Sequence, residues 1–150
     1  MKKKIAILSV LVILLGVGNV FAQAKQDMWS LLAKTKFEPK YFENLKEYIF
    51  YPNFPEDVKA LDGKEVTIEG FYVPFGSDEE NFIILSKVPQ SQCFFCGGAG
   101  PESVVEVSFA KAVPKFQVDD VITVRGKLKL NADDMEHMNF ILKDAEVVSK

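Results

Sequence analysis

Both cysteines of the chain lie in one short stretch, Cys93-Phe94-Phe95-Cys96-Gly97. Two cysteines separated by two residues bring their sulfur atoms close enough to share a metal ion or to form a disulfide. The glycine after the second cysteine accepts a left-handed backbone conformation without steric cost, and such a turn directs backbone N–H groups toward the sulfur. The pattern therefore predicts a knuckle-like turn that presents two thiols side by side.

The residues after Cys96 argue against a redox-active dithiol of the thioredoxin type. In such a site the first cysteine lies at the N-terminus of a helix, whose dipole lowers the thiol pKa. Here the run from Gly97 to Ser103, Gly-Gly-Ala-Gly-Pro-Glu-Ser, does not start a helix near Cys93. Attachment of a c-type haem would need histidine at position 97. Thiol–disulfide exchange is therefore the weakest interpretation, after a metal site and a structural disulfide.

A metal site needs further ligands, and the chain has one histidine, His137. A closed zinc site takes four nitrogen, sulfur or oxygen ligands. If successive strands reverse direction, the loop with the cysteines and the loop with His137 lie at the same end of the sheet. We therefore expect Cys93, Cys96 and His137 to converge on zinc. The fourth ligand would be water or one of the nearby carboxylates: Glu102, Asp133 and Asp134.

Two other ligand arrangements stay open. Met135 and Met138 flank His137, and thiolate with thioether ligands favours copper(I). The same two loops of a second chain could also complete the site.

The alternative to a metal site is a non-enzymatic interaction module. Two cysteines in an oxidising compartment pair by default, and a Cys93–Cys96 disulfide would staple the loop. Phe94 and Phe95 would then either pack over the sulfurs or bind a partner protein, because exposed phenylalanines at a loop tip form an adhesive patch.

The N-terminus predicts export. Three lysines at positions 2–4 precede an apolar run from Ile5 to Val20, and the small residue Ala22 ends the segment. These are the marks of a signal peptide over residues 1–22, and we expect a periplasmic protein. The alternative is a membrane anchor, but the run is shorter than the roughly 20 residues of a spanning helix. We expect no membrane span after cleavage.

Charge excludes some classes of partner. The chain has 18 Lys and Arg and 21 Asp and Glu. Cleavage removes three lysines and no acids, so the mature charge is 15 minus 21, or −6. Such a protein is a poor candidate for nucleic acid, whose phosphates require basic residues. No catalytic triad, phosphate loop or dinucleotide fingerprint is present, and we assign no catalytic residue.

The second half of the chain predicts strands. Alternating or apolar runs separated by turn residues cover residues 64–73, 82–85, 103–109, 121–130 and 140–148. Glycines inside two long strands predict strong bends. We expect residues 64–150 to form a small five-stranded antiparallel Greek-key barrel, mainly β and OB-fold-like. The alternative is an open antiparallel sheet covered by N-terminal helices.

Residues 23–63 are expected to pack on this barrel with one or two short helices. Asp27 can cap a helix over residues 28–34, in which Trp29 anchors the segment. Apolar residues at helical spacing predict a short helix over 40–47 and an extended piece over 48–51. Residues 55–61 read as a helical turn with proline at its start.

Several of these segments resemble a family of uncharacterised exported bacterial proteins, a domain-of-unknown-function type. The resemblance covers about residues 26–110. It is carried by Trp29, by the segments 61–74 and 82–85, and by the loop Cys-Phe-Phe-Cys-Gly-Gly-Ala-Gly-Pro-Glu-Ser, which resembles a Bacteroidetes-type branch. The broader family carries Cys-x-His followed by prolines in this loop, whereas this chain has a second cysteine.

The family resemblance implies a small OB-like domain with a cysteine-bearing loop and no established catalytic activity. Some relatives are encoded beside metal-uptake or ABC-type export genes. The resemblance thus implies metal handling, with a transport-system or envelope protein as partner.

Overall fold

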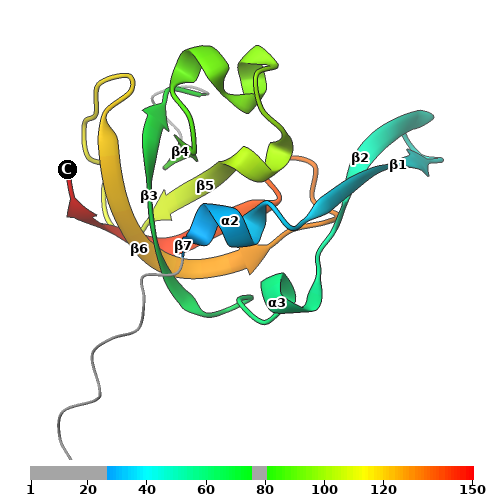
Figure 1. Ribbon diagram of the computed structural model, residues 1–150, viewed down its shortest axis with the longest axis horizontal. Coiled ribbons are helices and arrows are strands. Elements are labelled where there is room, and N and C mark those ends of the chain that lie inside the picture. The colour runs from blue at the N-terminus through cyan, green and yellow to red at the C-terminus, as the bar shows by residue number, and fades with distance from the viewer. Residues whose placement is uncertain (1–26, 76–80) are drawn as a thin grey trace, which may run out of the picture.

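The computed structural model describes residues 27–75 and 81–150, so the expected signal peptide lies outside the described residues. Five strands form a closed barrel in the order β3-β4-β5-β7-β6 (Figure 1). Their bounds are β3 Glu65–Val73, β4 Phe82–Ser86, β5 Val104–Phe109, β6 Val121–Leu130 and β7 Phe140–Ser149. The described residues contain no helix long and apolar enough to cross a membrane.

The expectation of a small, mainly β, OB-like barrel is confirmed, and the open-sheet alternative is wrong because β3 also pairs with β6. The expectation of a purely antiparallel barrel is wrong in one place. β7 lies between β5 and β6 and pairs with β5 in parallel. Because β6 reverses β5 and β7 reverses β6, β5 and β7 run the same way.

Two short helices precede the barrel, as expected. In α2 (Met28–Leu32) the Asp27 side chain accepts a hydrogen bond from the backbone N–H of Trp29, at 3.2 Å. The second helix, α3 (Glu56–Lys59), follows Pro55. Trp29 is buried and its indole Nε1 donates to the carbonyl oxygen of Glu69 on β3, at 2.6 Å. The predicted anchoring role of Trp29 is therefore confirmed.

Gly70 on β3 leaves room for both the neighbouring strand and the Trp29 anchor. A Cβ atom at Gly70 would lie 2.6 Å from the carbonyl oxygen of Ser86 and 3.0 Å from the Trp29 ring. Only glycine lets the neighbouring strand and the indole approach this closely. Among the described residues, the main core comprises fifteen buried residues from the barrel strands and from α2 and α3: Trp29, Leu32, Val58, Val66, Ile68, Ile83, Leu85, Val105, Val107, Ile122, Val124, Leu128, Phe140, Leu142 and Ala145.

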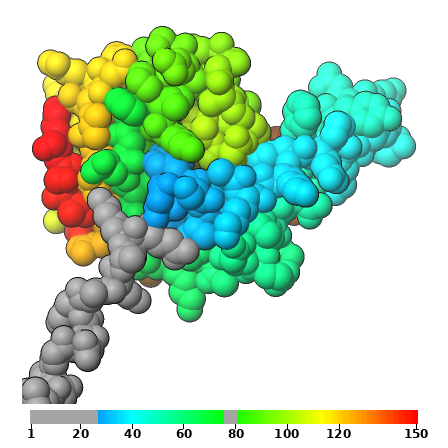
Figure 2. Space-filling view, viewed as in Figure 1, coloured from blue at the N-terminus to red at the C-terminus, as the bar shows by residue number. Residues whose placement is uncertain are grey.

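The predicted helix over 40–47 is wrong. Residues 36–53 form an antiparallel hairpin of β1 (Lys36–Phe42) and β2 (Glu47–Asn53). The apolar residues that fit a helical spacing lie instead in both strands and in the turn between them: Tyr41 and Phe42 in β1, Leu45 in the turn, and Tyr48 and Ile49 in β2. The β-rich run Tyr48–Tyr51 favours a strand, and residues 36–42 supply its pairing partner. The hairpin projects away from the barrel (Figures 1 and 2).

Candidate functional site

The cysteines lie in the loop between β4 and β5, which consists largely of three short 3-10 turns. These are η1 (Gln90–Gln92), η2 (Phe94–Cys96) and η3 (Pro101–Ser103). The loop is closed at its base by the Lys87 N–H, which donates to the Ser103 carbonyl at 2.9 Å. The backbone therefore organises the loop locally.

The expected knuckle-like turn is present. Gly97 follows Cys96 in the left-handed region with φ 76°. The N–H groups of Cys96 and Gly98 donate to the Cys93 carbonyl at 3.1 and 3.2 Å, and the Gly97 N–H donates to the Phe94 carbonyl at 3.0 Å. These N–H groups were expected to turn toward sulfur and instead bind carbonyl oxygens.

The two sulfurs lie side by side as free thiols, with Sγ atoms 4.0 Å apart. Two thiolates on a tetrahedral zinc ion, with Zn–S bonds of about 2.3 Å, would stand about 3.8 Å apart. Cys93 is fully buried in a small apolar cluster, whereas Cys96 is exposed. The Cys93 thiol beside it, and to a smaller extent desolvation, raise the pKa of the Cys96 thiol.

His137 lies in the loop between β6 and β7, which side-chain hydrogen bonds hold in place. The buried Asn131 amide donates to the carbonyls of Asp134, His137 and Met138 at 2.7, 3.2 and 3.2 Å. Its Oδ1 accepts from the Asp134 N–H at 3.0 Å. The Asn131 side chain thus bonds to the backbone at three positions of the loop.

A buried carboxylate on β5 orients the imidazole. His137 Nδ1 lies 2.9 and 3.1 Å from the two carboxylate oxygens of Glu106, whose Oε2 also accepts from the Met138 N–H at 3.1 Å. Glu106 is 1% exposed. A carboxylate on one ring nitrogen sets the tautomer and leaves Nε2 for a ligand or a metal.

Sequence reasoning missed Glu106. Its available signal was a single acid inside the apolar run from Val104 to Val107, since an unpaired carboxylate is rarely buried. The histidine that accompanies it lies 31 positions away, so only the fold brings the two together.

The two loops lie at the same end of the barrel, as expected. Met138 packs against the cluster that contains Cys93, and residues of both loops line one groove. Within 27–75 and 81–150, however, no three His, Cys, Asp or Glu side chains form a group that could hold a metal. The cysteines form one pair and His137 with Glu106 another, so the three-residue centre stays a prediction.

Among the expected fourth ligands, Asp133 accepts a hydrogen bond from the Tyr51 hydroxyl at 3.2 Å. Glu102 and Asp134 line the groove that the loops share.

Phe94 and Phe95 form an exposed aromatic cluster with Phe75. The Phe75 and Phe95 rings stack at 4.3 Å, and the Phe94 and Phe95 rings meet edge to face at 5.4 Å. All three side chains are more than a third exposed. We call these three residues, Phe75, Phe94 and Phe95, the Phe75–Phe95 cluster. It forms an exposed apolar surface beside the cysteines.

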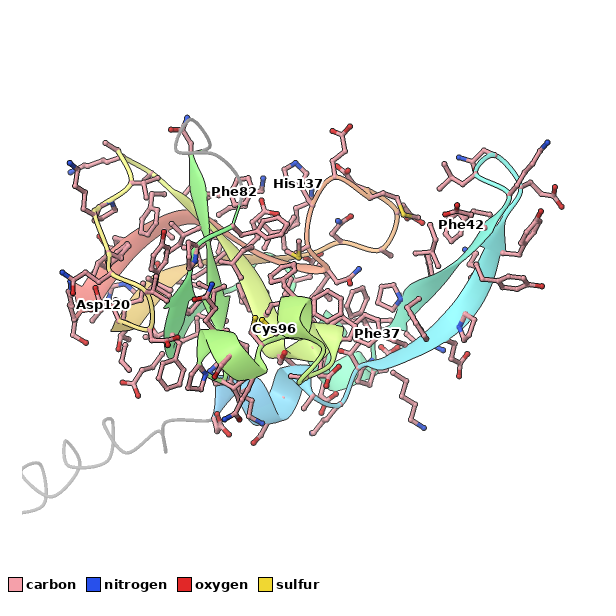
Figure 3. The ribbon with its side chains drawn as sticks, turned by 90° about the horizontal axis from the view of Figure 1, so that it is seen from above. Phe37, Phe42, Phe82, Cys96, Asp120 and His137 are labelled. Atoms are coloured by element: carbon pink, nitrogen blue, oxygen red, sulfur yellow. The ribbon has the colours of Figure 1, made fainter. Side chains whose placement is uncertain are left out.

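The groove lies between the hairpin and the two loops and has a volume of about 790 Å³. The loops that carry Cys96 and His137 both lie beside the hairpin (Figure 3). The lining includes four consecutive residues of β2 and five aromatic rings, namely Phe37, Tyr48, Phe50, Tyr51 and Phe94.

No protein-family model matches the chain, and no curated protein matches it. Among solved structures, the chain is similar to a DUF3299 family protein from Pseudomonas aeruginosa PAO1. The two share 19% sequence identity with a TM-score of 0.46 over 66% of this chain and 68% of that chain. That protein belongs to a family of domains of unknown function, and a similarity at this level carries no argument about activity.

Proposed function

We propose that the chain is an exported, periplasmic binding protein that holds a thiophilic transition metal, zinc first, through Cys93 and Cys96. The observation that carries the proposal is the 4.0 Å separation of two free sulfurs on a glycine-ended turn. The sulfur–sulfur distance between two thiolates bound to one zinc ion is about 3.8 Å, which is close to this separation. Copper(I) is the alternative cargo, because it also favours thiolates.

His137 is the proposed third ligand, brought within reach by a movement of the cysteine loop. Its support is the carboxylate behind it, since metal-binding histidines usually have a carboxylate or carbonyl on the other ring nitrogen. Glu106 stands in that position at 2.9 Å from Nδ1. A transport-system or envelope protein would receive or supply the metal.

The test is metal content and affinity of the mature protein, purified without chelator and reduced anaerobically. We expect about one zinc per chain, and Cys96→Ser to weaken zinc binding at least about a hundredfold. Cys96 is exposed, so its replacement leaves the core intact. His137→Gln should weaken binding about tenfold to a hundredfold if the imidazole is a ligand.

Met135→Leu is the matched control for zinc, because this exposed residue lies two positions from His137 and carries a soft sulfur. It should leave zinc binding unchanged and weaken copper(I) binding if the thioether takes part. Retention of less than about 0.1 zinc or copper per chain by the wild type would contradict the proposal.

The second candidate is an interaction module, favoured by the exposed Phe75–Phe95 cluster. A Cys93–Cys96 disulfide would close the loop beneath that cluster. Mass spectrometry of freshly isolated, alkylated protein distinguishes the two candidates: a disulfide gives no alkylation at either cysteine, whereas free or metal-bound thiols become alkylated after chelation.

A further inference from the structure

The groove runs along one edge of the hairpin. Four consecutive residues of β2, Tyr48 to Tyr51, line it, whereas β1 contributes only Phe37. Because consecutive side chains of a strand point to opposite faces, four in a row can border one groove only along the strand's edge. The outer edge of β2 therefore faces the groove.

That edge has no partner in the parts of the chain that the structure describes. Residues of β2 pair with β1, and outside that pairing none of their backbone groups hydrogen-bonds to another element there. An unpaired edge offers a row of N–H and C=O groups to another strand, and proteins usually block it with lysine or proline.

The two edges of the hairpin differ in this protection. β1 carries Lys36, Pro39 and Lys40, whereas β2 has no lysine and its proline, Pro52, lies at the buried end beside the barrel. Tyr48 is 73% and Phe50 65% exposed. A two-stranded hairpin is marginal in water, and a third strand stabilises it.

The charge of the groove indicates what that strand carries. Apart from His137, the ionisable acidic and basic residues of its lining are Glu102 and Asp134, and none of the described lysines or arginines lines it. Aromatic rings also attract cations. The hairpin gives an example: the Lys40 Nζ atom lies 3.8 Å from the centre of the Tyr51 ring.

A buried polar atom adjoins the same groove without a partner. Thr35 lines the groove and is 5% exposed, and its hydroxyl has no hydrogen-bond partner among the described residues. A buried hydroxyl without a partner is costly, and a segment seated in the groove could supply one.

We propose that β2 accepts an extended segment of a partner protein as a third strand. The segment carries apolar side chains at alternate positions and at least one lysine or arginine facing Glu102 and Asp134. Backbone hydrogen bonds to β2 supply affinity, and the groove selects the side chains, as in strand-addition recognition. The inference does not depend on whether the cysteines hold a metal.

The probe is a displayed library of random peptides about eight residues long, selected on the mature protein with a chelator present. We expect enriched sequences with alternating apolar residues and a Lys or Arg. An enriched peptide is then resynthesised with N-methyl groups along one edge or along the other. Methylation of the pairing edge should reduce affinity at least about tenfold, and methylation of the other edge should not, because only the first removes shared hydrogen bonds.

Charge reversal tests whether the basic side chain of the peptide lies beside Glu102 and Asp134. Glu102→Lys and Asp134→Lys should each weaken the basic peptide about tenfold or more, whereas Glu38→Lys, on β1 outside the lining, should not. The proposal is overturned if no sequence is enriched, if enriched peptides are acidic, or if both methylated peptides bind equally. Equal loss in Glu38→Lys and Glu102→Lys would also overturn it.

Discussion

The two loops at one end of the barrel are built in opposite ways. The cysteine loop is organised mainly by its own backbone, in short 3-10 turns closed by the Lys87–Ser103 hydrogen bond, and the buried Cys93 anchors it in an apolar cluster. The loop from Asn131 to Asn139 is organised by two buried polar side chains, Asn131 within it and Glu106 on β5. The exposed turn at Cys96 and Gly97 can therefore change locally, whereas a change at Asn131 or Glu106 reaches the core.

The largest effect is expected from Asn131→Ala. The substitution removes four hydrogen bonds of a buried amide and should lower the free energy of unfolding by about 2–4 kcal/mol. Denaturant unfolding gives the magnitude, and amide exchange should rise across residues 132–139 but not across the cysteine loop. Equal exchange in the two loops would contradict the difference between them.

A smaller effect is expected from Glu106→Gln. The amide keeps the shape of the side chain but loses the charge-assisted contact with His137 Nδ1, at a cost of about 1.5–3 kcal/mol. Nitrogen NMR should show a changed imidazole tautomer, because the carboxylate no longer sets it. Unchanged ring signals would mean that Glu106 does not orient His137.

Gly97→Ala should have the smallest effect and should stay local. A side chain at φ 76° costs roughly 1–2 kcal/mol in the left-handed region, and no neighbouring atom lies within 4 Å of the new Cβ. Thermal unfolding gives the cost, with Gly63→Ala, at φ 72° in a distant turn, as the matched control. A much larger loss at Gly97 than at Gly63 would show that the knuckle is coupled to the core.

The difference between the loops also explains what could be predicted from the sequence. The knuckle is a local property of Cys93 to Gly97, and its left-handed glycine was predicted correctly. The strands predicted between residues 64 and 148 were equally local, because alternation or a short apolar run is visible in the residues themselves. The Glu106–His137 pair joins positions that lie far apart in the sequence, and no local pattern predicts their contact.

The hairpin shows a different reason why sequence-based prediction failed. Its apolar residues at 41, 42, 45, 48 and 49 fit a helical spacing, but strand pairing with the register Tyr41 to Tyr48 decided the structure. Periodicity alone does not separate helix from strand in short aromatic runs. The groove that depends on this hairpin was consequently absent from the sequence-based expectation.

The position of Trp29 makes the protein its own optical reporter. It is the only tryptophan, and its ring is packed against Gly70 with its nitrogen bonded to the strand beneath. Its fluorescence should therefore follow the integrity of the barrel. Tyr48 and Tyr51, two of the four tyrosines, line the groove, so tyrosine fluorescence should respond to occupation of the groove while Trp29 follows the barrel in the same unlabelled chain.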